Sequence, residues 1–285
     1  MSMRKLQSAV AVILAVLLPV AGTASEAPAP QLDRGFHLLY NLDFAAAQKE
    51  FAEWQRLHPD DPMGPVAEAA GMLFSEFDRL GVLETQLFVR DSSFSDKQKF
   101  MPDPDLRARF ERALERGESL AIERLAANEN DRDALLAMTL SEGLQADYAS
   151  LIDKSNLKAL SYTRQATQWA DRLLAVDPEC YDAYLATGIS KYIVGSLVAP
   201  LRWVLRLDGY RGNKKEGMAE VAITAERGRY LKPFARVLLA VAHLREKDIA
   251  QARALLTGLR DEFPANPLFA RELARLEKDP SCKNC

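Results

Sequence analysis

Apolar residues recur every three or four positions along most of this chain, which is the period of an amphipathic helix. One face at this spacing is formed by Ala47, Phe51, Trp54 and Leu57. Asp43 stands just before it, in the position of an N-cap. The alternating pattern of strands is nearly absent, and no Asn-Gly or Asp-Gly turn joins two alternating runs. The sequence therefore predicts an all-α fold.

Two stretches near the ends of the helical region share one spacing of small and large residues. In the first stretch, separations of 12, 4 and 8 positions join Gly35, Ala47, Phe51 and Pro59. In the second stretch, the same separations join Ala240, Ala252, Leu256 and Pro264. A small residue in one helix lets the next helix approach closely, and the two residues after it line the packed seam. The proline then stops the second helix, and a further proline three residues later fits the first turn of a third.

This spacing resembles the tetratricopeptide repeat, a helix–turn–helix unit of about 34 residues. The resemblance is good over residues 28–75 and 233–277, and degenerate copies lie between them. These copies keep the last two separations at Gly117, Ala121 and Glu129, at Ala166, Ala170 and Pro178, and at Val221, Ala225 and Pro233. The resemblance implies a right-handed superhelix of about four or five antiparallel helix pairs with inserted loops. One insertion is expected around residues 153–156.

The resemblance also implies that the first helix of each pair lines a concave face. By spacing, the lining positions are Leu32, Phe36, Leu39 and Tyr40 in the first repeat, and Phe234, Val237, Val241, Leu244 and Arg245 in the last. Most of these side chains are apolar, so inserted helices either bury them or leave a groove for a peptide or a partner helix. The candidate partner-binding residues are Phe36, Tyr40, Tyr192, Trp203, Arg236 and Arg245.

Residues 1–24 have the pattern of a secretory signal peptide, in which Arg4 and Lys5 precede a mostly apolar run. The run is shorter than the ~20 residues that span a membrane, which disfavours a retained anchor. Small residues at 22–24 suit a signal peptidase, and 25–27 are a second option. An Ala/Pro linker at 25–31, a helical domain at 32–278 and a tail at 279–285 follow. We expect export to the periplasm or cell envelope of a bacterium.

The segment from Ile193 to Asn213 interrupts the helical pattern. It sets Arg202 and Trp203 among apolar residues, and glycines and basic residues follow. Three interpretations are open: a flap packed over the superhelix, a dock for a partner protein, or a short helix at a membrane interface. A polar stretch from Phe88 to Pro104 is a second interruption, and we expect it to be a loop that leads into a helix near Leu106.

Composition and charge narrow the classes of function. The 285 residues include 37 Lys and Arg and 40 Asp and Glu, a net charge of −3, so the overall charge does not indicate nucleic-acid binding. Phosphate-binding glycine motifs and the Gly-x-Ser-x-Gly motif are absent. His37, His58 and His243 lie far apart, without a His-Glu-x-x-His pattern. We therefore expect no catalytic residue, cofactor or metal site.

Three cysteines are present: Cys180, and Cys282 with Cys285 in a C-terminal Cys-x-x-Cys pair. In an exported protein, a local disulfide between Cys282 and Cys285 is the first interpretation. Free thiols, an intermolecular link, and metal or redox chemistry are the alternatives. Cys180 is expected to be a small buried residue.

The sequence favours a non-enzymatic binding or assembly protein of the bacterial cell envelope, which presents a helical-repeat surface to a partner protein or peptide. A second hypothesis is an envelope factor that contacts lipid or a membrane protein through the Trp203 segment. A third is a small-ligand-binding helical protein. An enzyme on this scaffold would need polar side chains that converge in one deep pocket.

Overall fold

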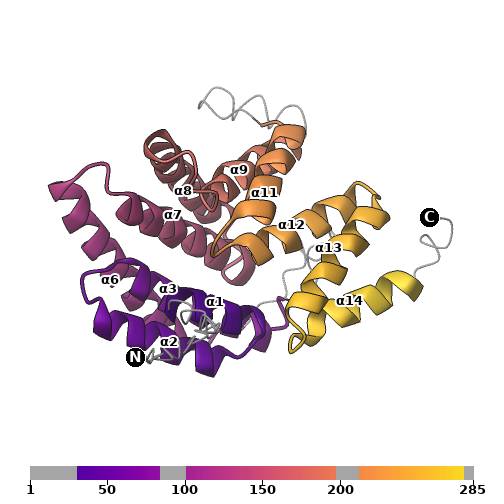
Figure 1. Cartoon of the computed structure of the whole chain (residues 1–285), viewed down its shortest axis with the longest axis horizontal. Helices are drawn as coiled ribbons and strands as arrows, with labels where there is room; N and C mark the ends of the chain where they lie inside the picture. Colours follow the sequence, from indigo (N-terminus) through magenta and orange to yellow (C-terminus); the bar gives the residue numbers. More distant parts are fainter. Residues whose placement is uncertain (1–30, 84–100, 197–211, 279–285) are drawn as a thin grey trace, which may run out of the picture.

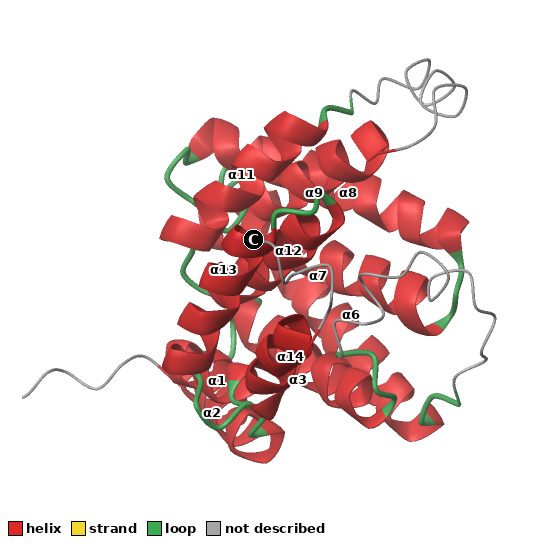
Figure 2. Ribbon diagram, turned by 90° about the vertical axis from the view of Figure 1, so that its right-hand side faces the viewer, coloured by secondary structure: helices red, strands yellow, loops and turns green. Residues whose placement is uncertain are grey.

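The computed structural model describes residues 31–83, 101–196 and 212–278, and every regular element in these ranges is a helix (Figure 2). The all-α prediction is therefore confirmed. The described elements are α1 (Gln31–Tyr40), α2 (Phe44–Leu57), α3 (Met63–Arg79), α6 (Pro104–Ala127), α7 (Arg132–Asp147), the π-helical turn η1 (Tyr148–Ile152), α8 (Asn156–Val176), α9 (Tyr184–Ser196), α11 (Lys214–Arg227), α12 (Lys232–Arg245), α13 (Ile249–Glu262) and α14 (Pro267–Lys278). Helices that follow one another in the chain pack against each other as antiparallel neighbours (Figure 1).

The turn inside the helix pair is the same in the first and last repeats. Leu42 and Lys247 each follow the first helix of a pair and adopt left-handed backbone angles, with φ of 62° and 63°. Asp43 and Asp248 come next, and each carboxylate accepts the backbone N–H three residues later, at 3.1 and 3.2 Å. A cap of this kind satisfies one of the free N–H groups at a helix start. The two repeats are therefore equivalent in backbone geometry, 205 positions apart.

The turn that ends the second helix of a pair occurs four times in the described chain. In each copy, one residue donates its N–H to the carbonyl four positions earlier, at 2.7–2.9 Å. The carbonyl of the same residue then accepts the N–H of the residue three positions later, at 3.0–3.1 Å. The pairs are His58 and Asp61, Asn128 and Asp131, Asp177 and Cys180, and Phe263 and Asn266. Two of them end the degenerate copies at Ala121 and Ala170, so these segments do form helix pairs.

Small residues allow the close helix packing that the spacing predicts. A Cβ atom added to Gly35 would lie only 2.2 Å from Cε1 of Phe51, so the two helices of the first pair touch at this point. Ala47 and Phe51 are fully buried, and their equivalents Ala252 and Leu256 are buried to 0% and 1% exposure. The seam residues of both repeats therefore play the same packing role.

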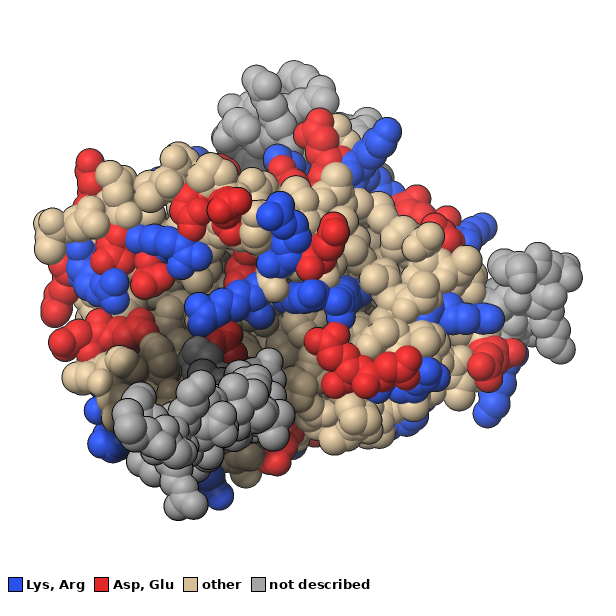
Figure 3. Space-filling model, viewed as in Figure 1, with Lys and Arg blue, Asp and Glu red and all other residues tan. Residues whose placement is uncertain are grey.

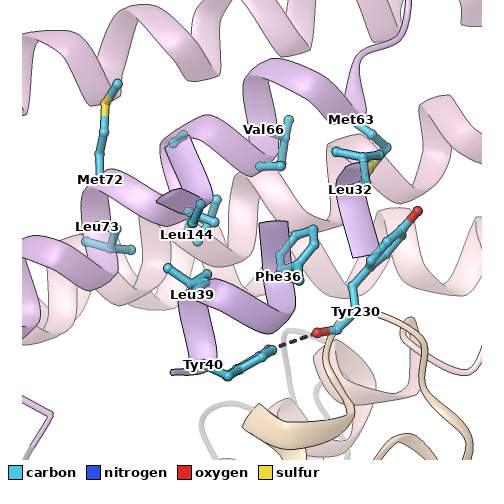
Figure 4. Close-up of a cluster of buried hydrophobic side chains, with 14 of the residues drawn as sticks. Leu32, Phe36, Leu39, Tyr40, Met63, Val66, Met72, Leu73, Leu144 and Tyr230 are labelled. Carbon is cyan, nitrogen blue, oxygen red and sulfur yellow. Dashed lines mark hydrogen bonds between the residues drawn. The ribbon is translucent and has the colours of Figure 1, made fainter. Parts of the chain in front are cut away.

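The first helix contacts the loops near the end of the chain. The Tyr40 hydroxyl donates to the carbonyl of Tyr230 at 2.8 Å (Figure 4), and the Asn266 side chain donates to the carbonyl of Tyr40 at 2.9 Å. Arg229 makes two hydrogen bonds to Asp33, at 2.8 and 2.9 Å. In a simple solenoid each repeat touches only its neighbours. Here the stack curls until its two ends meet (Figure 1).

The structure describes part of the interruptions that were predicted in the helical pattern. The insertion expected at 153–156 is present, because η1 and a bend separate α7 from α8. Asp103 caps α6 by accepting from the N–H groups of Asp105 and Leu106, as the helix expected near Leu106 requires. Residues 193–196 belong to α9, so the assignment of an irregular segment from Ile193 was wrong at its start. Those four residues continue the helical hydrogen bonding of the preceding turn.

Several predicted features lie outside the described residues. They are the signal peptide, most of the linker, Trp203, and Cys282 with Cys285. Cys180 is buried, as expected, with 3% of its surface exposed. None of the described helices has both the length and the apolar character of a membrane-spanning helix.

Candidate functional site

The curled stack contains a largely apolar cavity of about 490 Å³. Its wall comes from both ends of the chain and from the middle. Phe74 and Phe77 belong to α3, Leu151 to η1, Ile189 to α9 and Leu238 to α12. Because these elements are held together by the closure of the stack, most of the described wall is formed by packed helices.

A second cavity of about 110 Å³ adjoins the first. The two cavities share six wall residues, which are Leu39, Tyr40, Phe74, Asp147, Ile189 and Phe234. Five of these six side chains are apolar or aromatic. Among the residues that the structure describes, Asp147 is therefore the one charged group shared by the two cavities.

The chain places Asp147 at a break in helix geometry. Asp147 is the last residue of α7, and η1 begins directly after it. In η1 the N–H of Asp153 donates to the carbonyl of Tyr148, five positions back, at 3.1 Å. Lys154 then adopts a left-handed φ of 53° and turns the chain into α8. Short π-helical turns inside α-helices occur frequently at functional sites, because they redirect the side chains around them.

The surroundings of Asp147 disfavour its charged form. Burial raises the pKa of this carboxyl to about 7. Within the described residues, the carboxyl group of Asp147 has no hydrogen bond and no ion pair. Its side chain is only half-buried by surface area, and it lines both cavities, so its remaining exposed surface faces cavity space.

Three other polar groups of the main cavity have partners within the fold. Tyr40 uses its hydroxyl to hold the closure of the stack, and burial raises the pKa of this phenol. Asn266 donates to the carbonyl of Tyr40, and Glu272 forms an ion pair with Arg275 at 2.6 Å. Among the carboxylates of this wall, Asp147 is thus the one without a described protein partner.

The structure brings together four of the six candidate partner-binding residues. Tyr40, Tyr192 and Arg245 line the main cavity, and Phe36 lines the smaller one. Phe36 is also a core residue, since its ring lies 5.4 Å from that of Phe51 and 4.9 Å from that of Tyr230 (Figure 4 shows its place in the core).

Arg236 lies apart from this group. Its guanidinium donates to the carbonyl of Ala225 at 3.1 Å and pairs with Glu262, and it lines neither cavity. The role of Arg236 in the fold is thus to link α12 to α11 and α13. The sixth candidate, Trp203, lies outside the described residues.

Sequence reasoning placed part of the α12 wall and missed Asp147. Phe234, Val237, Val241 and Arg245 line the cavity at the spacing that the repeat implies. Asp147 gave one signal, since it is the only charged residue from Leu144 to Ile152. An acid in such a run is equally compatible with a solvated helix face, so only the structure reveals that Asp147 is partly buried in a cavity wall.

A separate polar pocket of about 220 Å³ has three arginines in its wall. Arg132 pairs with Asp177, Arg229 pairs with Asp33, and Arg227 lies over a tyrosine ring with 3.9 Å between the guanidinium carbon and the ring centroid. These contacts already engage the arginines. Acidic and basic side chains are also interspersed over the face in Figure 3.

Within the described ranges, no group of three or more His, Cys, Asp and Glu residues is arranged to hold a metal ion. His243 and Asp248 form a pair of potential ligands, with 3.2 Å between Nδ1 and Oδ2, but no third ligand joins them among the described residues. None of the three histidines lines either apolar cavity. Among the described residues, the main cavity offers mostly apolar contact, together with the carboxyl group of Asp147, the Glu272 carboxylate paired with Arg275, and Arg245.

Comparisons with known proteins did not identify a family. No family model matches this chain, and no curated protein matches it.

Proposed function

We propose that this protein is a non-enzymatic binding protein whose concave cavity receives an apolar segment of a partner polypeptide. The observation that carries the proposal is the cavity of about 490 Å³ between α12 and the rest of the stack. Its volume is within the range of about 300–1,000 Å³ that ligand pockets occupy. Apolar side chains from several helices form its wall, which suits apolar side chains of a partner.

The helix pairs support the same proposal. The turn that recurs four times gives the stack the backbone regularity of a tetratricopeptide-like array. Arrays of this type commonly present an extended concave surface to a partner. We therefore also propose a distant relationship to the tetratricopeptide repeats, together with the right-handed superhelix that this relationship implies.

The proposed location is the bacterial periplasm or the cell envelope. The pattern at residues 1–24, with two basic residues before an apolar run, supports export. N-terminal sequencing of the protein isolated from its cell tests this part of the proposal. A chain that still begins at Met1 would contradict it.

Site-specific photo-crosslinking tests the binding function. A benzophenone amino acid at Leu238, in the cavity wall, is expected to form an adduct with a partner polypeptide on irradiation in cells. The matched control places the same group at Ile122 of α6, which is apolar but 57% exposed and lines neither cavity. Absence of an adduct at 238, or the same adducts at both positions, would contradict the proposal.

A second candidate function is the binding of a small apolar molecule. The observation that favours it is the smaller cavity of about 110 Å³, which adjoins the first and extends its apolar space. The same experiment separates the two candidates. A polypeptide adduct supports the first, and an adduct that adds only the mass of a small molecule supports the second.

A further inference from the structure

We infer that Asp147 is the specificity-determining residue of the main cavity and that it binds the ammonium group of a lysine carried by the apolar segment of the partner. This inference rests on the proposed function and names the chemistry of the partner. Three observations support it: the partners of the buried carboxyl groups, the backbone conformation next to Asp147, and the complementarity of the cavity to an alkyl ammonium.

Two other buried acids of the core, Asp182 and Glu76, have partners that stabilise their charge. Asp182 accepts the backbone N–H groups of Tyr230 and Leu231, at 3.1 and 3.0 Å. Glu76 pairs with Arg79 at 2.7 Å and also accepts the N–H of residue 103 at 2.8 Å. A buried carboxylate without such partners destabilises a fold. Glu142 also lacks a hydrogen bond at Oε2, but it lines neither cavity. Asp147 lines both, so at Asp147 there is space for a ligand that supplies the missing partner.

The backbone conformation also changes directly after Asp147. The π-helical turn begins at the next residue, and the turn ends in a left-handed residue that leads into α8. Asp147, Ser150 and Leu151 line one wall of the cavity, at separations of three and four positions that share a helix face.

The cavity is complementary to an alkyl chain that ends in a cation. Most of the wall is apolar, which suits the methylene stem of a lysine and its apolar neighbours. Asp147 is the acid placed where the two cavities meet. A lysine ammonium donates up to three hydrogen bonds, so it can satisfy both oxygens of one carboxylate.

Among the described residues, the charged and titratable groups that line the two cavities with Asp147 come from four helices and the turn before α9. They are Tyr40 of α1, Asp182 before α9, Tyr192 of α9, Arg245 of α12 and Glu272 of α14. The two acids in this group already have partners, as described above. Arg245 is exposed at the last turn of α12, and Tyr40 is hydrogen-bonded to a backbone carbonyl.

The proton balance makes the inference testable by pH. Since the pKa of Asp147 is raised to about 7, the empty site is mostly neutral below this pH. Binding of an ammonium requires the carboxylate, so the carboxyl proton is released to solvent when the cation enters at lower pH. Affinity for the cation should therefore rise as the pH increases through 7, until the amine itself loses its proton.

The test measures the binding of decylamine, decanol and decanoate to the purified protein by calorimetry. At about pH 8 we expect decylamine to bind about tenfold more tightly than decanol, and decanoate to bind most weakly. At about pH 6 the advantage of the amine should shrink, and its binding should release protons, seen as a dependence of the heat on the buffer.

Two variants sharpen the result. Asp147→Asn keeps the size of the side chain and should abolish the advantage of decylamine while decanol binds as before. Glu142→Gln is the matched control, because Glu142 lies on the same helix, is buried, and has a pKa that burial and Glu118 raise to about 7. It lines neither cavity, so the preference for the amine should persist.

The outcomes separate this inference from the proposed function. Equal binding of the amine and the alcohol, or an amine preference that survives Asp147→Asn, overturns the role of Asp147 but leaves the apolar binding function standing. Binding of none of the three probes overturns both. The segment cross-linked at position 238 provides an independent check, since a segment without a lysine would also overturn the inference.

Discussion

The first and last repeats of this chain share a backbone and a packing seam, yet their concave faces have different surroundings. Leu32 and Tyr40 in α1 are 2% and 9% exposed. Their equivalents 205 positions later are Val237, which is half-buried, and Arg245, which is exposed. In α1 both side chains belong to the core, where Tyr40 also borders the cavity, and in α12 both equivalents are more exposed and line the cavity.

The difference comes from the helices that follow each repeat. Behind α1 and α2 the chain continues into α3, and α7 packs against α3, so the first repeat is largely covered (Figure 4). Leu32 lines neither apolar cavity, whereas Phe36, Leu39 and Tyr40 are core residues that also border one or both. After α12 and α13 the chain has only α14 to add among the described elements. The repeat motif therefore specifies how two helices pair, but whether their concave face is buried or open depends on the elements around the pair.

The largest effect is expected at the seam of the first repeat. Phe51→Ala should lower the free energy of unfolding by about 4 kcal/mol, because Phe51 is fully buried against Gly35. Leu256→Ala, its equivalent, should cost about 3 kcal/mol, since a smaller side chain is lost. Urea denaturation measures both values. A loss at position 256 that exceeds the loss at 51 would contradict the packing argument.

A second pair of variants compares equivalent positions on the concave faces of the two repeats. Leu32→Ala should lower the free energy of unfolding by about 3 kcal/mol, because a core side chain is removed. Val237→Ala should cost only about 1 kcal/mol, because Val237 borders space that is already empty. Decanol titrations of the two variants provide the matching control. Val237→Ala should weaken decanol binding, whereas Leu32→Ala should leave it unchanged while the protein is folded.

The third prediction concerns the stability of the empty site. Asp147→Asn should raise the free energy of unfolding by about 2 kcal/mol at about pH 8, less than the full pKa shift would give because the cavity admits water. The folded pKa of about 7 lies above the ordinary value of 3.8. The stabilisation from the protonated carboxyl is therefore present below about pH 4 and is lost as the pH rises to 7.

Thermal unfolding of the wild-type protein and the Asn variant across this pH range measures the effect. The two curves should coincide at about pH 4 and diverge towards pH 7. A variant that is less stable than the wild type at about pH 8 would show that Asp147 has a stabilising partner. Higher stability with a lost preference for the amine is the signature of a residue selected for binding.

The smallest effect is expected at the surface contact that joins the two ends of the stack. Arg229→Ala removes the paired hydrogen bonds to Asp33 and should lower the free energy of unfolding by about 1 kcal/mol or less. The loss should shrink further in high salt, because more than half of the arginine side chain is exposed. Asn266→Ala is the contrasting variant, since its buried bond to the carbonyl of Tyr40 does not depend on salt.

Much of the fold could be predicted from local pattern. The helical period, the caps at Asp43 and Asp248, and the close contact at Gly35 are all set by residues within one helix pair. The insertion before α8 was also placed correctly, because a repeat offset revealed the extra residues. Arg236 shows the limit of prediction from spacing. Its position in α12 is compatible by spacing with the concave face, but its side chain contacts α11 and α13 instead.

What the sequence by itself determined is the helix pair: its period, its small residues, its caps and its stopping prolines all act within about 34 residues of chain. What only the tertiary structure decided is the closure of the stack and the fate of its concave face. Tyr40 meets Tyr230 across 190 positions, and Asp147 lies between α3 and α12 in a cavity built from both. Burial, and with it the raised pKa of that carboxyl, is a property of everything packed around a residue, and no local pattern contains it.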